Sequence, residues 1–235
     1  MADRKSLRLA AGLLIVGLVL YVIATFFHVM IDAANKTGSG NNHAGVFTAI
    51  AAGDSWTAVH LGQFIAIAVQ TAGLLALYHG LNITTGMPAW ANRFAAMAAV
   101  VSLALAGVVY AVDGVVLKQA ADAWVNAPAS EKAARFASAE TVRWLEWGTR
   151  SYQTVTLGFA ILLFGTAIVS TARVARPLGY VMAVSGVATF VVGWQTGVEG
   201  FASSTQTAMS VWAVLLLVWI VWLLVIAWRM NPSQA

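Results

Sequence analysis

The chain has 235 residues, of which 60% are hydrophobic and 9% are charged, with a formal net charge of +4 and no cysteine. A soluble domain carries roughly 25% charged and 45–50% apolar residues, so this composition excludes a soluble enzyme and a disordered regulator. The lack of cysteine excludes a disulfide-linked secreted domain and cysteine-based zinc or haem sites. The basic residues do not gather in one solvated patch, so we expect no nucleic-acid partner.

Long apolar segments bounded by charges, glycine or tryptophan recur along the chain, each long enough to cross about 30 Å of hydrocarbon as a helix. They cover residues 9–31, 57–79, 94–117, 148–171, 177–198 and 207–228. A membrane β-barrel would alternate apolar and polar residues, and the segment from Leu13 to Phe27 does not. We predict an all-α, polytopic bundle of six transmembrane helices, with residues 1–235 forming a single integral membrane domain.

The first segment follows Arg4, Lys5 and Arg8, which resembles the basic region of a signal peptide. Its apolar run is longer than the 7–15 residues typical of such peptides. We therefore expect an uncleaved first transmembrane helix.

Basic residues in the short loops set the orientation of a membrane protein, because they stay in the cytoplasm. The predicted cytoplasmic side carries Arg4, Lys5, Arg8, Arg93, Arg173, Arg176 and Arg229. This pattern predicts a protein of the bacterial cytoplasmic (inner) membrane with both termini in the cytoplasm.

Two outer segments are long. Residues 32–56 are rich in glycine and asparagine, which predicts a flexible loop. Residues 131–147 interleave apolar residues with charges, which predicts an amphipathic helix lying on the outer surface, in position to act as a lid.

Histidines and carboxylates gather near the predicted outer ends of the spans, and such groups at membrane depth are functional candidates. Arg8 to His28 and Arg93 to Asp113 are each 20 residues apart, a rise of about 30 Å that brings His28 and Asp113 to one level. The candidate metal ligands are His28, Asp32, His60, Asp113, Glu146 and Glu199. Asp113 and Glu199 have no basic residue within four positions, and they are also the candidate catalytic carboxylates.

Imidazoles and carboxylates together suit a transition metal such as Fe, Mn or Zn. The set resembles in composition the di-iron and di-manganese sites of helix bundles, although the Glu-x-x-His spacing is absent. A mononuclear zinc or iron site made by His28, Asp32 and His60, with Asp113 as ligand or general base, fits equally well.

Other interpretations of these residues stay open. Asp32 has Lys36 four positions later, and Glu146 has Arg143 and Arg150 within one turn, so ordinary surface ion pairs would also explain both acids. Haem ligation by His28 and His60 is less favoured, because four acids beside a haem would be unusual.

Helix six carries an aromatic stripe of Trp212, Trp219 and Trp222. Such a stripe could stack on a quinone, a carotenoid or a lipid-like substrate, but packing or lipid contact is the more common role. Gly193 and Gly197 permit close helix approach, either inside the bundle or between copies.

The run Trp56-x-x-x-His60-x-x-Gln63-Phe64, the segment Gly73–Leu77 and the triplet Val112-Asp113-Gly114 resemble a broad set of uncharacterised bacterial multi-helix membrane proteins of unknown function. This resemblance covers helices two to five. It implies a bacterial membrane protein with about this number of helices and no particular activity.

Three classes of function remain from the sequence. The first is an outward-facing membrane metalloenzyme, an oxidoreductase or hydrolase acting on a lipid-like or small substrate, and only this class explains histidines and carboxylates at one level. The second is a non-catalytic subunit or scaffold, whose partners besides the lipid bilayer would be membrane proteins or a second copy. The third is a small-solute or ion transporter, which the one-ended distribution of ionisable groups disfavours.

Overall fold

The computed structural model describes residues 2–34 and 41–230, and within the first range it describes side chains as far as residue 28. These residues form helices joined by short connections and contain no strand, which confirms the predicted all-α fold. In chain order the helices are α1 (Arg4–Ala34), α2 (His43–Ala52), α3 (Trp56–Leu81), α4 (Gly86–Ala111), the π-helix η1 (Val112–Leu117), α5 (Lys118–Val125), α6 (Lys132–Thr171), α7 (Arg176–Glu199) and α8 (Ser203–Arg229).

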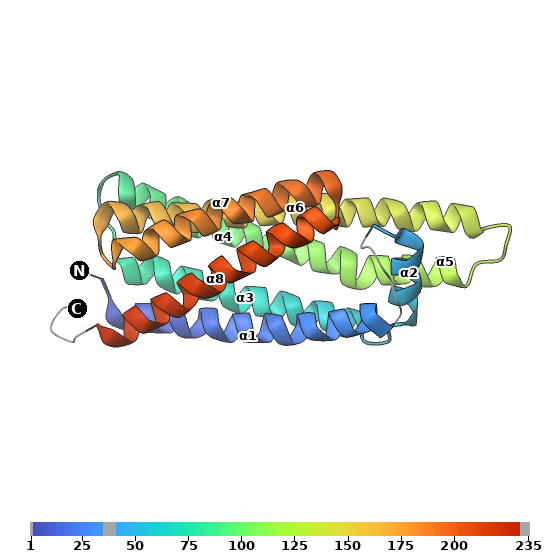
Figure 1. Cartoon of the computed structure of the whole chain (residues 1–235), viewed down its shortest axis with the longest axis horizontal. Helices are drawn as coiled ribbons and strands as arrows, with labels where there is room; N and C mark the ends of the chain where they lie inside the picture. Colours follow the sequence, from blue (N-terminus) through green and yellow to red (C-terminus); the bar gives the residue numbers. More distant parts are fainter. Residues whose placement is uncertain (1, 35–40, 231–235) are drawn as a thin grey trace.

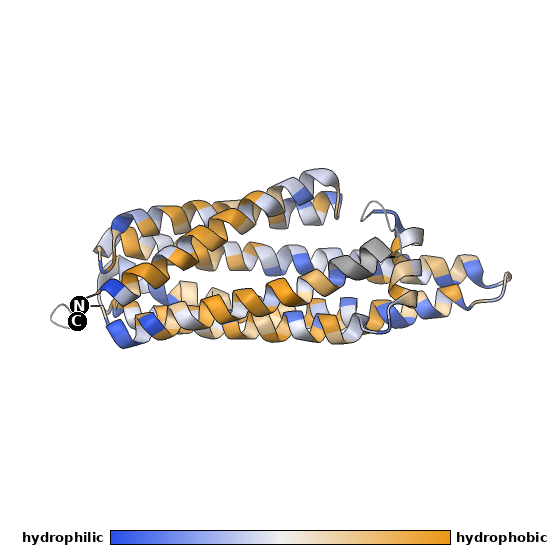
Figure 2. Cartoon of the chain, turned by 60° about the horizontal axis from the view of Figure 1, so that its bottom comes forward, coloured by the Kyte–Doolittle hydropathy of each residue, from blue (hydrophilic) through white to orange (hydrophobic). Residues whose placement is uncertain are grey.

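Six helical segments are long and apolar enough to span a membrane, which confirms the predicted number of spans. They are α1, α3, α4 with its continuation through η1 and α5, α6, α7 and α8. Their outer surfaces are apolar: Phe26 is 59% exposed, Val184 56% and Val214 62%. Lipid tails solvate such side chains at no cost, whereas water does not, and Figure 2 shows hydrophobic residues along the length of the spans.

The six spans form a ring in which each packs against the next, in the order α1, α3, α4, α6, α7, α8 and back to α1. Both termini lie at one end of this ring, which we call the inner end (Figure 1). The inner half has an apolar core that includes the fully buried side chains of Leu7, Leu77, Phe164 and Ile220. The spans are therefore held together there by close packing of aliphatic and aromatic groups.

Helices α6 and α7 approach each other so closely that only glycine fits at their contact. A Cβ atom on Gly186 would lie 2.5 Å from the backbone nitrogen of Leu162, and one on Gly165 would lie 2.6 Å from that of Ala183. Gly193 also faces α6, because a Cβ atom there would meet Val155 at 2.8 Å. The glycine spacing in α7 thus serves packing inside the bundle.

Two of the spans are much longer than a bilayer is thick. The segment Gly86–Val125 and the helix α6 each have 40 residues, or about 60 Å of helix against about 30 Å of hydrocarbon. Their outer parts project beyond the other spans and pack with α2 (Figure 1). We call α2, α5 and residues 132–147 of α6 the outer cap.

The outer cap has a small apolar core of its own, separate from that of the ring. The rings of Phe47, Trp124 and Phe136 contact one another with centroids 5.3–6.1 Å apart. The predicted helix over residues 131–147 is helical, but it is continuous with the fourth span and does not lie flat as a separate element. The predicted loop at 32–56 contains α2, and residues 35–40 of it lie outside the described part of the chain.

Candidate functional site

Asp113 lies in η1, a wide turn inserted between α4 and α5. A π-turn weakens the regular backbone ladder, and here side chains of α3 bind the carbonyl groups of that turn. The Trp56 Nε1 donates to the Asp113 carbonyl at 2.9 Å, and the Thr57 hydroxyl donates to the Gly114 carbonyl at 2.6 Å. Gly114 lets the two helices meet, because a Cβ atom there would lie 2.6 Å from the His60 Cβ.

His60 is buried, and both of its ring nitrogens face acceptors. Its Nδ1 lies 2.8 Å from the Trp56 carbonyl oxygen, and its Nε2 lies 3.1 Å from Oδ2 of Asp113. A carbonyl can only accept, so Nδ1 carries a hydrogen, and a hydrogen bond at Nε2 then needs a second proton. His60 and Asp113 therefore share one proton, as imidazolium with carboxylate or as imidazole with carboxylic acid.

Arg150 joins this pair to a second carboxylate. It donates from Nη2 to Asp113 Oδ2 at 2.9 Å and from Nε to Glu146 Oε1 at 2.8 Å. Arg143 donates from Nη1 to the other oxygen of Glu146 at 2.6 Å. Glu146 is fully buried, and a buried carboxylate needs such partners to stay ionised.

We call His60, Asp113, Arg143, Glu146 and Arg150 the polar cluster. It contains two guanidinium cations, one glutamate and a His–Asp pair that is neutral when the shared proton is counted. The cluster therefore carries one net positive charge.

Aromatic rings enclose the polar cluster. The Arg143 and Arg150 guanidinium groups lie 4.8 and 5.7 Å from the ring centre of Phe201, and Arg150 also lies 5.6 Å from that of Tyr110. Cations at such distances are attracted to the faces of aromatic rings. Phe201 comes from the connection between α7 and α8, so the cluster ties that connection to α6 and η1.

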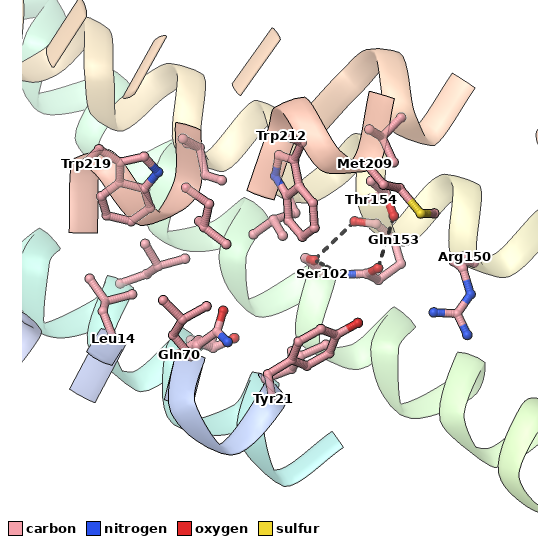
Figure 3. A pocket seen from close by; sticks show the side chains of 18 of the residues that line it. Leu14, Tyr21, Gln70, Ser102, Arg150, Gln153, Thr154, Met209, Trp212 and Trp219 are labelled. Carbon is pink, nitrogen blue, oxygen red and sulfur yellow. Dashed lines mark hydrogen bonds between the residues drawn. The ribbon is translucent and has the colours of Figure 1, made fainter. Parts of the chain in front are cut away.

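A cavity of about 130 Å³ lies inside the ring, beneath the polar cluster, and residues of all six spans line it. Arg150 and Tyr110 lie at its outer end, and leucines such as Leu14, Leu74 and Leu216 form much of the rest. Figure 3 shows Arg150 at one end of the cavity, Trp219 and Leu14 at the other, and the Tyr21 hydroxyl turned toward Arg150.

The cavity wall carries two pairs of polar side chains that differ in their hydrogen bonding. Ser102 and Gln153 are bonded to each other, with the Gln153 amide nitrogen 3.0 Å from the Ser102 hydroxyl (Figure 3). The indole nitrogens of Trp212 and Trp219 are instead buried and have no hydrogen-bond partner within the described residues. Such an unpaired buried donor is costly, so these two N–H groups point to a ligand or to bound water.

The structure brings three of the six predicted site residues together directly. The His28 ring lies 5.2 Å from the His60 ring, centre to centre, and His60 contacts Asp113. Glu146 joins them only through Arg150. The Asp32 side chain lies outside the described part of the structure, so its predicted role is not tested.

The contacts of Glu199 are with residues outside the polar cluster. Its side chain is exposed and bonds to the hydroxyl of Ser204, and its carbonyl oxygen accepts a hydrogen bond from the Asn41 amide at 2.8 Å. These contacts connect the end of α7 to the start of α8 and to the outer loop.

The described residues give the predicted metal centre no support. Among them, no three His, Asp or Glu side chains are placed to hold one ion. Both nitrogens of His60 are engaged, and the carboxylates of Asp113 and Glu146 are bound to guanidinium groups. The metal site stays a prediction, and haem ligation by His60 would require its present bonds to break.

Sequence reasoning missed the arginine contact that organises the site. An ion pair of Arg150 with Glu146, one turn away, was the alternative to a metal-ligand role for Glu146, and this pair forms, but a second bond of Arg150 reaches Asp113, 37 positions earlier. Spacing along the helix indicates only the local pair. The polar residues that line the cavity, such as Gln153 and Tyr21, had no distinguishing pattern.

No protein-family model, curated protein or solved structure matches this chain. Its function must therefore be inferred from its geometry and chemistry.

Proposed function

We propose that this protein binds a small, membrane-soluble molecule in the central cavity, with the polar cluster at the outer end of the bound molecule. The observation that carries this proposal is the cavity itself, which residues of all six spans line, among them two tryptophans whose buried indole N–H groups have no partner within the described part of the chain. Cores of proteins are close-packed, and voids larger than a water molecule are few. A cavity with aromatic walls and a few polar groups is typical of a ligand site.

Ligand binding in this cavity is compatible with an enzyme and with a transporter. It disfavours a scaffold. A scaffold needs helices that pack against partners, and a fully packed interior would serve it better. A metal centre is not part of the proposal, because guanidinium groups already bind the two buried carboxylates of the polar cluster.

The test measures saturable binding of one-ring probes to the full chain in mild detergent. We suggest 2,6-dimethyl-1,4-benzoquinone and 1,3-dimethylbenzene, each applied by equilibrium dialysis against empty micelles. Leu216→Trp should fill the cavity and abolish binding, because Leu216 lines it and is only 8% exposed. Val214→Trp adds the same ring on the lipid-facing side of α8, where Val214 is 62% exposed, and should leave binding unchanged.

Binding of either probe that is lost in Leu216→Trp alone would support the proposal. If neither probe binds beyond its partition into micelles, the proposal is wrong. Since Leu216→Trp could unfold the protein, Leu18→Trp places the same obstruction from α1 and gives a second test.

We further propose that the chain lies in the bacterial cytoplasmic membrane with both termini in the cytoplasm. The inner end supports this orientation, because the short α6–α7 connection and the start of α1 carry several arginines, among them Arg8, Arg173 and Arg176. The chain has no cysteine, so single cysteines report location directly. In intact cells a membrane-impermeant thiol reagent should label Ser130→Cys in the connection between α5 and α6 and spare Thr84→Cys at the inner end, and the reverse pattern would invert the orientation.

A further inference from the structure

We infer that the ligand of the central cavity is a single six-membered ring that carries oxygen acceptors, the chemistry of a quinone headgroup. This inference rests on the proposed function and adds the chemical class of the ligand. Three independent features of the cavity carry it: its size, its donors and its charge.

The size of the cavity fits one ring. Its volume is about 130 Å³, and an engineered cavity of roughly 150 Å³ in another protein binds one benzene molecule. Trp212, Trp219 and Tyr21 present aromatic faces and edges to this space (Figure 3). Aromatic rings pack favourably against one another in offset or edge-to-face arrangements, so a planar ring suits these walls.

Two polar atoms of the cavity lining are fully buried and have no partner within the described residues, and both are donors. The Nε1 groups of Trp212 and Trp219 are buried and lack a partner among the described residues, and an indole N–H can only donate. The Ser102 and Gln153 side chains, in contrast, bond to each other. A ligand that fills the cavity must therefore offer acceptors, which an aliphatic chain or a bare hydrocarbon ring lacks.

The positive charge at the outer end of the cavity also favours a ligand that carries oxygen acceptors. Arg150 lines the cavity there, and the polar cluster to which it belongs carries one net positive charge. Carbonyl or phenolate oxygens are attracted to such a site, whereas an amine or another cation is repelled. The two indole donors are seven residues apart on α8, about 10 Å along the helix, so an oxygen-bearing ring has a donor within reach toward either end of the cavity.

The experiment compares two probes of nearly the same shape. 2,6-dimethyl-1,4-benzoquinone carries two carbonyl oxygens, and 1,3-dimethylbenzene carries none. The absence of cysteine removes the thiols that would otherwise react with a quinone. Equilibrium dialysis of the full chain in mild detergent, corrected for empty micelles, gives the Kd of each probe.

We expect the quinone to bind at least about tenfold more tightly than the hydrocarbon, because two hydrogen bonds distinguish them. Trp212→Phe and Trp219→Phe keep an aromatic ring and remove one donor each. Each should weaken quinone binding about fivefold relative to hydrocarbon binding, because the hydrocarbon corrects for the space that the smaller ring leaves. Trp222→Phe is the matched control, because Trp222 lies on the same helix outside the cavity lining and should change neither Kd.

Equal affinity for the two probes, or quinone binding that both Trp→Phe variants leave unchanged, would overturn the inference while the cavity remained a binding site. Failure of both probes to bind would instead remove the proposed function itself. Thermal unfolding of each variant shows whether a loss of binding reflects a loss of fold.

Discussion

The inner and outer halves of the ring differ in the kinds of side chain that they bury. The inner half buries leucine, isoleucine and phenylalanine side chains. The outer half buries Arg143, two carboxylates and a histidine, half-buries Arg150, inserts a π-turn and leaves a cavity beneath these groups.

The two halves therefore differ in how strongly each buried group depends on a particular partner. Apolar packing in a membrane holds helices together without requiring any particular partner for each group. Buried ionic groups stabilise little against an apolar alternative, yet each becomes costly once its partner is removed. The outer half is thus the less tolerant of change.

The largest effect should come from Arg150→Met. It leaves Asp113 without its guanidinium partner and Glu146 with one bond fewer, both within the buried cluster. We expect a loss of about 3–5 kcal/mol in the free energy of unfolding, measured by thermal or denaturant unfolding in detergent.

Arg135→Met is the control for that change. Arg135 pairs with Glu131 at 3.1 Å, but both side chains are more than half exposed. Its loss should cost less than about 1 kcal/mol. Similar losses for the two variants would mean that the polar cluster is hydrated and would remove the contrast between the halves.

The close contact of α6 and α7 should give the next largest effect. Gly186→Ala puts a Cβ atom 2.5 Å from the Leu162 backbone nitrogen, so the helices must separate. We expect about 2 kcal/mol of destabilisation by overpacking. Gly12→Ala in α1 meets nothing within 4 Å and should stabilise the protein by about 0.5–1 kcal/mol, so a loss in both variants would refute this account.

Trp56→Phe tests the backbone of η1 with a smaller expected effect. The variant keeps an aromatic ring and leaves the Asp113 carbonyl without its indole donor. We expect a loss of about 1 kcal/mol and faster amide exchange in residues 112–117. Trp194→Phe, at a site that is 66% exposed, should change neither quantity.

The smallest effect concerns the exposed charges at the inner end. The Ser6 hydroxyl and the Lys5 backbone N–H bond to the Asp3 carboxylate and lower the pKa of Asp3. A lowered pKa means that the ionised form stabilises the fold above the ordinary pKa of the group and that this contribution is lost as the pH falls through the lowered value. Ser6→Ala should raise the pKa of Asp3, as followed by an NMR titration of its carboxyl carbon, while Ser6→Thr should preserve it.

Most of the fold follows from the sequence, because hydropathy and length are local properties. Each apolar segment had to become a helix, since only helices and closed barrels satisfy the backbone in lipid. Counting residues brought His28 and Asp113 to one level, and in the structure both contact His60, with the His28 ring 5.2 Å away and the Asp113 carboxylate 3.1 Å away. Depth along a helix can be counted from the sequence in this way.

What a sequence alone does not give is the rotation of each helix about its axis. The pairing of Arg150 with Glu146 was open to sequence analysis as an alternative, because residues three or four positions apart share a helix face. Its bond to Asp113 depends on how α4, η1 and α6 face each other, which no local pattern records. The same helix rotations determine the burial of that ion pair, the direction of the Trp212 side chain and the presence of the cavity.

The π-turn at residues 112–117 has one more consequence for how this protein is compared with others. A π-turn accommodates one additional residue, and one residue corresponds to about 100° around a regular helix. In the third span, the spacing that places residues on one face is therefore counted separately before Val112 and after Leu117. Deleting a single residue between them would leave one helical wheel for the whole span and remove the wide turn whose carbonyl groups Trp56 and Thr57 bind, so an alignment gap here would mark a changed outer site rather than a neutral loss.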